Sequence, residues 1–182
     1  MRKNLVTMIV ATLFGVSTAN ATVYRFSFES SDAGLTATGQ MTVNAAGEVT
    51  GLSGLISGLA DQTISAIAPN PNFSSPAYSP DGSFIYNNLF HSTGMAFDTN
   101  GVLFATHQNP GGYWNLWGTS PGNYALWESF GPANYPIQAS GNLNVAAAPE
   151  LSTWAMLGMG LAALGLVGQR RRREPRLAPS LG

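Results

Sequence analysis

Two histidines, His91 and His107, are the side chains of this sequence best suited to acid-base chemistry near neutral pH. A fold that turned either of them toward Asp81 or Asp98 could form a hydrolytic site. The sequence contains no G-x-S-x-G elbow, no H-E-x-x-H pair and no phosphate-binding loop that would support such a site. We therefore expect isolated histidines and no catalytic centre, and we keep a secreted hydrolase that uses His91 or His107 as an alternative function.

The segment Asp98-Thr99-Asn100-Gly101 matches the centre of a calcium-binding loop. The further acidic residue and the distal glutamate that such a loop needs are missing, and a hairpin turn explains the same residues without a metal. The chain has no cysteine, which excludes disulfides, a thiolate nucleophile and thiolate-bound zinc or iron-sulfur sites. We expect no metal and no cofactor, with calcium left open at this loop.

Aromatic side chains are concentrated in residues 113–135, beside several asparagines. The candidate glycan-binding residues are Tyr113, Trp114, Trp117, Tyr124 and Trp127. Aromatic faces can stack on the apolar faces of sugar rings while amides bind the hydroxyl groups. Alternation along strands would bury half of these side chains whatever the function, so simple filling of a core is the competing interpretation.

The charges of the central region limit its partners. Residues 22–148 contain one cation, Arg25, and seven carboxylates, which leaves a net charge of -6. Such a surface repels phosphate backbones and anionic headgroups, which excludes nucleic acid as a partner. A glycan bound by this region would be neutral or cationic.

Several segments have the period of two that indicates a half-buried strand. Residues 22–29 alternate aromatic with polar side chains, and residues 35–43 alternate apolar residues and glycine with threonine and glutamine. Residues 51–60 combine three glycines with leucine and isoleucine, which favours a strand and a bend over a helix. These segments must position the candidate residues that follow them.

Two segments match at an offset of 19 residues, residues 77–86 and 96–105, and each has D-G or N-G between apolar runs. That pattern predicts two hairpins. Proline-glycine turns precede two further strands, and residues 137–145 provide the last one. Nine or ten strands and no convincing helix predict an all-β exported domain over residues 22–148, an antiparallel β-sandwich or a jelly-roll-like domain.

The first 21 residues have the pattern of a secretory signal peptide. Arg2 and Lys3 precede an apolar run over residues 5–16, and the small residues Ala19 and Ala21 follow it. The run is too short to span a bilayer, and small residues at these two positions suit signal peptidase. The sequence predicts cleavage after Ala21.

Residues 151–169 contain no charged side chain and predict a transmembrane helix. A helix of this length reaches about 28 Å, close to the ~30 Å of a hydrocarbon core. Trp154 lies near its outer boundary, and the cluster Arg170, Arg171, Arg172 and Arg173 follows it. Arginines mark the cytoplasmic side of a span, so residues 174–182 are expected to be a cytoplasmic tail and the central domain to lie across the inner membrane.

The residues around the start of this span carry a resemblance to a known family. They are Pro149, Glu150, Leu151, Ser152, Thr153 and Trp154. Together with the apolar stretch and the arginine cluster, residues 149–173 resemble the PEP-CTERM sorting tail of Gram-negative bacteria. The resemblance implies processing by an exosortase, a membrane-embedded cysteine protease-transpeptidase, after a transient stay in the inner membrane. It also implies a host that makes an exopolysaccharide.

Leu151 departs from the family pattern, which has a second proline there. A proline would hold Glu150 in an extended conformation, so its absence lets a helix begin earlier and predicts slower or altered processing. A permanent single-span anchor is the alternative. The sequence thus predicts a non-enzymatic surface or matrix protein with a structural or adhesive role, with a glycan-binding module and a secreted hydrolase as alternative functions.

Overall fold

The computed structural model describes residues 21–58, 61–72, 75–131, 134–148 and 157–161. The signal peptide apart from Ala21, the sorting motif at 149–154, most of the proposed span, the arginine cluster and the tail at 174–182 lie outside the described residues. Ala21 is exposed immediately before the first strand, and residues 157–161 are helical and exposed. No helix within the described residues has both the length and the apolar character needed to cross a membrane.

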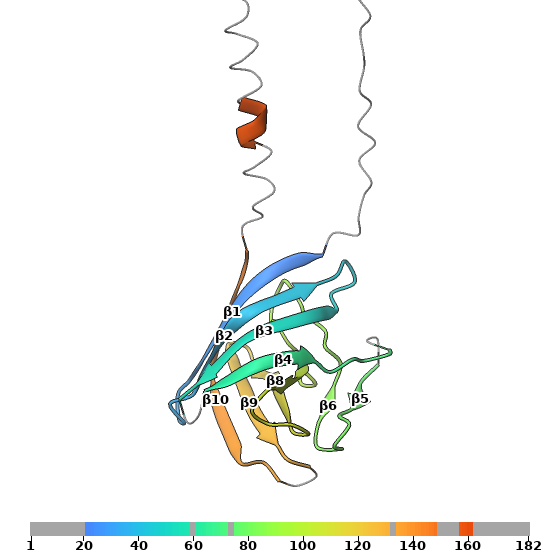
Figure 1. Ribbon diagram of the computed structural model, residues 1–182, viewed down its shortest axis with the longest axis vertical. Coiled ribbons are helices and arrows are strands. Elements are labelled where there is room, and N and C mark those ends of the chain that lie inside the picture. The colour runs from blue at the N-terminus through green and yellow to red at the C-terminus, as the bar shows by residue number, and fades with distance from the viewer. Residues whose placement is uncertain (1–20, 59–60, 73–74, 132–133, 149–156, 162–182) are drawn as a thin grey trace, which may run out of the picture.

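Ten strands account for most of the described part of the chain. They are β1 (Thr22–Ser30), β2 (Thr36–Val43), β3 (Val49–Ser57), β4 (Gln62–Ile67), β5 (Ala77–Tyr78), β6 (Ile85–Tyr86), β7 (Val102–Thr106), β8 (Tyr113–Ser120), β9 (Asn123–Ser129) and β10 (Ile137–Ala147). Eight of them form a closed antiparallel barrel in the order β1-β10-β9-β8-β7-β4-β3-β2, and β5 pairs only with β6 (Figure 1). Nearly every strand of the barrel therefore lies beside its neighbour in the sequence.

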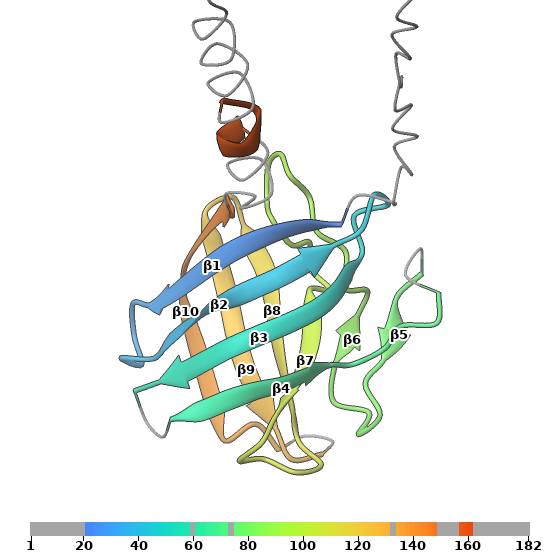
Figure 2. The same ribbon diagram turned by 45° about the horizontal axis from the view of Figure 1, so that its top comes forward.

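The all-β antiparallel class is confirmed, whereas a sandwich or a jelly roll is wrong for the described residues. The strand β10 pairs with β9 through its first residues and with β1 through its later ones, so the sheet closes on itself and does not divide into the two facing sheets of a sandwich. Tyr24 lies opposite Ala147, and the Ala148 N–H donates to the Val23 carbonyl at 2.8 Å. The beginning of β1 and the end of β10 thus leave the barrel at the same rim (Figure 2).

The predicted alternation of β1 is confirmed. Phe26 and Phe28 are buried inside the barrel, while Arg25, Ser27 and Glu29 are exposed. Room for the Phe26 ring comes from small residues on the next strands: a Cβ placed on Gly39 would lie 2.8 Å from that ring and 2.0 Å from the Ser53 carbonyl oxygen. An eight-stranded barrel is just wide enough for side chains to fill it, and this glycine allows the close approach.

One end of the barrel interior is polar. The Gln62 side chain donates to Glu128 Oε1 at 3.0 Å and accepts from the Thr106 hydroxyl at 2.6 Å and from the Trp114 indole N–H at 3.1 Å. Asn109 also donates to Glu128 Oε1, at 2.9 Å. All five side chains are buried. Because an unpaired polar group in such a place is costly, this network specifies how β4, β7, β8 and β9 meet.

The connection between β4 and β7 packs against the outside of the β7–β8–β9 wall through Ala68, Phe84 and Tyr86, and we call this part of the chain the cover. Phe90 and Phe97, farther along the same connection, belong to the barrel core. The predicted hairpin at residues 77–86 is confirmed as β5 and β6. The second predicted hairpin, at residues 96–105, is wrong: Phe97 bridges to Phe90, and β7 instead pairs with β4 and β8. The Asp-Gly and Asn-Gly signals each make a turn, but the partner of the second apolar run lies elsewhere in the chain.

Candidate functional site

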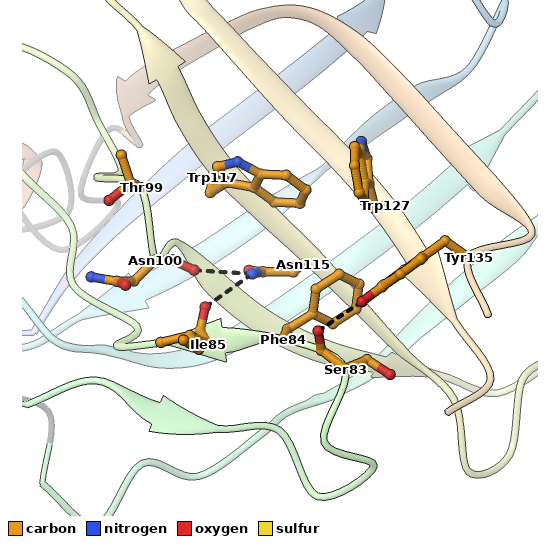
Figure 3. Close-up of a pocket in the computed structure, with 9 residues that line it drawn as sticks. All are labelled: Ser83, Phe84, Ile85, Thr99, Asn100, Asn115, Trp117, Trp127 and Tyr135. Carbon is orange, nitrogen blue, oxygen red and sulfur yellow. Dashed lines mark hydrogen bonds between the residues drawn. The ribbon is translucent and has the colours of Figure 1, made fainter. Parts of the chain in front are cut away.

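A surface pocket of about 390 Å³ lies between this covering segment and the outer face of β8 and β9 (Figure 3). Its lining residues are Ser83, Phe84, Ile85, Thr99, Asn100, Asn115, Trp117, Trp127 and Tyr135. They come from the β5–β6 hairpin, the segment before β7, the strands β8 and β9, and the loop before β10. The pocket therefore exists only where the barrel and its cover meet.

Four aromatic rings in this pocket form a closed circuit of neighbouring pairs. Ring centroids are 6.2 Å apart for Phe84 and Trp117, 5.1 Å for Trp117 and Trp127, 5.5 Å for Trp127 and Tyr135, and 5.6 Å for Tyr135 and Phe84. The ring planes are inclined to one another by 49 to 73°. Phe84 is buried, whereas the other three rings are partly exposed.

Polar groups hold this aromatic circuit in place. The Asn115 amide donates to the backbone oxygens of Asn100 at 3.0 Å and Ile85 at 3.4 Å, and so fastens β8 to the cover. The Tyr135 hydroxyl donates to the Ser83 carbonyl at 3.0 Å (Figure 3). Asn115 is 3% exposed, and its Oδ1 has no hydrogen-bond partner. A buried acceptor of this kind beside a pocket is costly unless something else bonds to it.

Two carboxylates support the pocket walls from outside its lining. Asp81 accepts hydrogen bonds from the hydroxyls of Ser79 and Ser129, both at 2.5 Å, and from Ser83. Burial by itself would raise the pKa of Asp81, but these hydrogen bonds, led by the one from Ser129, outweigh it and leave the pKa below its usual value. The carboxylate is therefore ionised at neutral pH and ties the β5–β6 turn to the end of β9.

Asp98 does the same on the other side of the pocket. It accepts from the backbone N–H groups of Asn100 at 2.8 Å and Gly101 at 3.1 Å, and from the Asn87 amide at 2.7 Å. Burial acts to raise the pKa of Asp98, and the hydrogen bonds from Asn100, Gly101 and Asn87 lower it by more. These bonds form a turn, and Gly101 has a φ of 74°, which favours glycine.

The candidate glycan-binding residues divide between the two faces of the wall. Trp117 and Trp127 lie in the pocket, as the aromatic hypothesis requires. Trp114 and Tyr124 point into the barrel and are buried, so they are not part of a surface site. Tyr113 packs beneath the cover without lining the pocket. The period of two separates Trp114 from Trp117, because an odd spacing puts two residues on opposite faces of a strand.

Sequence reasoning did not select Phe84 or Ser83 for this site, whereas Asn115 is one of the amides that it placed beside the aromatic segment. Phe84 follows the Asp81-Gly82 turn, and the turn signal indicated only a hairpin. Its contact with β8 depends on a segment far away in the sequence. Asn115 is adjacent to Trp114 on β8 and therefore lies on the opposite face of the strand, on the same side as Trp117.

The histidines are not brought into a catalytic arrangement. His91 and His107 are both exposed, and neither imidazole has a hydrogen bond or ion pair among the described residues. The carboxylates of Asp81 and Asp98 bond instead to the turn groups described above. The described residues thus offer no pairing for the hydrolase alternative.

The calcium hypothesis has a similar outcome. The carboxylate of Asp98 caps its own turn, although this turn does not close the hairpin that the metal-free interpretation expects. Within the described ranges, no three His, Asp or Glu side chains are grouped so that they could hold a metal ion.

Another surface hollow, of about 480 Å³, lies along residues 48–50 and 67–71 and includes Asn88. It has no aromatic side chain in its lining and therefore no face on which a sugar ring could stack. The aromatic pocket is the better candidate for a binding site. No family model matches this chain, and no curated protein and no solved structure matches it either.

Proposed function

We propose that this protein is an exported surface or matrix protein whose barrel binds a glycan chain in the aromatic pocket. The single observation that carries the proposal is the circuit of Phe84, Trp117, Trp127 and Tyr135 around an accessible pocket without a charged lining residue. Accessible ring faces next to hydroxyl and amide groups suit a sugar, which has apolar faces and polar edges. The pocket also has the size of a small-molecule site.

The surface next to the pocket supports a ligand longer than one sugar. Tyr78 is 72% exposed and lies opposite Ile85 in the β5–β6 pair. Opposite residues of an antiparallel pair share one face, so Tyr78 and Ile85 form an apolar strip. Ile85 also lines the pocket, which makes this strip continuous with it. An aromatic side chain exposed to this extent is available for contact with the next sugar of a chain. The exopolysaccharide implied by the PEP-CTERM-like tail is such a polymer.

The proposed localisation is based on the sequences of the two ends of the chain. An exosortase-like enzyme would act on Pro149, Glu150 and the residues after them, with the arginine cluster at 170–173 on the cytoplasmic side. What supports this proposal is the order of motif, apolar stretch and arginines. The last barrel strand ends at Ala147, directly before the motif, so a cut there would remove no strand. Mass spectrometry of the mature protein tests it, because an intact C terminus that contains Arg170 would contradict sorting.

Binding is tested with the full chain and a neutral oligosaccharide. We expect cellohexaose or an N-acetylglucosamine hexamer to bind the wild-type protein in isothermal titration calorimetry. Trp117→Ala should weaken binding at least about tenfold, because stacking of a planar ring on one aromatic side chain contributes roughly 1–3 kcal/mol. Phe130→Ala is the matched control: this aromatic side chain is 54% exposed but lies outside the pocket.

Equal loss of affinity in the two variants would contradict the assignment of binding to this pocket. Thermal unfolding of each variant shows whether a loss of binding is merely a loss of fold. Failure of the wild-type protein to bind any of the oligosaccharides, the amine-bearing one used below included, would overturn the proposed function.

A further inference from the structure

The aromatic pocket has a chemical bias that goes beyond its fit to sugars. Faces of aromatic rings carry negative electrostatic potential and attract cations, most strongly at Trp. Here two tryptophans, a tyrosine and a phenylalanine surround the same pocket at centroid spacings of 5.1 to 6.2 Å, with inclined planes (Figure 3). The partly exposed rings of Trp117, Trp127 and Tyr135 can contact a group bound in the pocket. Such a circuit suits a positively charged group better than a single stacking platform would.

The carboxylates behind the walls add to this bias. Asp81 bonds to Ser83, and Asp98 bonds to Asn100, so each carboxylate is bonded directly to a lining residue. No lysine, arginine or histidine lines the pocket. Arg25, the one cation of residues 22–148, lies exposed on β1, away from the lining residues. Two negative charges near a partly enclosed apolar site favour a cation there.

The hydrogen-bonding groups of the lining point the same way. Side-chain donors of Ser83, Asn100, Asn115 and Tyr135 each already bond to an acceptor of the protein, whereas the Thr99 hydroxyl and the indole N–H groups of Trp117 and Trp127 have no partner among the described residues. The oxygens of the first four can still accept, and Asn115 Oδ1 is a buried acceptor with no partner. A protonated amine can donate to these acceptors, so they also favour a cation in the pocket.

From these three observations we infer that the pocket binds a protonated primary amine carried on a sugar ring, as in a chain of glucosamine units. This inference deepens the proposed function and rests on it. The ring skeleton stacks on Trp117, the ammonium group lies against Trp127 and Tyr135, and Tyr78 contacts the neighbouring sugar. An N-acetylated sugar lacks the charge and has fewer donors.

The test compares two ligands that differ only at this nitrogen. The full chain is titrated at about pH 6 with a β-1,4-linked glucosamine hexamer and with the corresponding N-acetylglucosamine hexamer. We expect the amine form to bind at least about tenfold more tightly and to lose affinity as salt rises, since the added interaction is electrostatic. Equal binding, or tighter binding of the acetylated form, would overturn the inference and leave the proposed function standing.

A variant pair locates the effect in the circuit. Trp127→Phe keeps an aromatic face and Trp127→Leu removes it, so we expect the preference for the amine form to fall about threefold in the first and about tenfold in the second. Phe130→Leu, outside the pocket, should leave the preference unchanged. If the Leu variant fails to fold, the comparison of the two ligands on the wild-type protein still decides. An unchanged preference in both folded Trp127 variants would contradict the placement of the ammonium group.

Discussion

The outer face of the barrel wall is exposed on one side of the barrel and covered on the other. On β1, β2 and β10 the inward side chains are apolar, and the outward ones are mostly exposed serine, threonine, asparagine and glutamine. On β7, β8 and β9 nearly every residue is buried or partly buried, whichever way it points. The second side therefore packs on both faces, against the barrel interior and against the cover.

This difference shows where a binding site can form in such a barrel. The interior holds Trp114, Phe28 and Phe104 at no more than 1% exposure, so a filled core leaves no place for a ligand. The covered wall instead meets a segment with irregular structure, and the packing leaves a hollow where the two meet. The aromatic pocket is that place, and it combines rings from the regular wall with turns from the cover.

The largest expected difference in stability is between replacement of Trp114, in the core, and replacement of Trp117, in the pocket. Trp114→Ala removes a fully buried indole and should lower the free energy of unfolding by about 3–5 kcal/mol. Trp117→Ala, on the covered face, should cost less than about 2 kcal/mol because its ring is partly exposed. Chemical denaturation of both variants measures the difference. Equal losses would mean that packing under the cover contributes as much to the free energy of unfolding as packing in the interior.

The polar end of the interior should give the next largest effect. Gln62→Leu would leave Glu128, Thr106 and the Trp114 indole each without one buried partner, and we expect a loss of about 2–4 kcal/mol. Gln40→Leu is the matched control on the exposed face of β2, where a change within about 0.5 kcal/mol is expected. Denaturant midpoints report both values, and similar losses at the two positions would contradict a specifying role for the network.

Acid should weaken the cover by a smaller amount. Hydrogen bonds hold the pKa values of Asp81 and Asp98 below the usual value, so the unfolded chain takes up protons at a higher pH than the folded one. The stability that these carboxylates contribute is present at neutral pH and is lost as the pH falls below about 4. Thermal unfolding from pH 7 to pH 3 should show this decrease. Asp81→Asn should make the unfolding temperature depend less on pH. An unchanged dependence would contradict a contribution of the Asp81 carboxylate to stability.

Strands and the faces of their side chains could be predicted from the sequence, because both depend on local alternation. Residues 22–29 and 35–43 have the expected period, and residues 51–60 mostly form the end of β3, the strand favoured there. Barrel closure could not be predicted, since the same alternation serves a sandwich and a barrel. It depends on β10 pairing with the adjacent β9 and also with β1, which lies more than 100 residues earlier in the sequence.

The candidate site could be predicted only in part, for the same reason. The dense aromatic segment correctly included Trp117 and Trp127, and alternation correctly indicated that about half of its members would be buried. Phe84 and the acceptor of Asn115 enter the site through contacts between the cover and β8, which no local pattern encodes. Glu128 was counted as a surface charge, yet it lies inside the barrel because Gln62 and Asn109 supply its hydrogen bonds.

The pairing of the first barrel strand with the last has a mechanical consequence. Val23 and Ala148 are joined by a hydrogen bond at the rim where both strands leave the barrel. A force that pulled these two ends apart would load the bonds between β1 and β10 one after another, like a zipper, which resists far less than loading all of them in shear. A barrel held through one end alone carries no such load, so attachment at a single terminus suits this architecture.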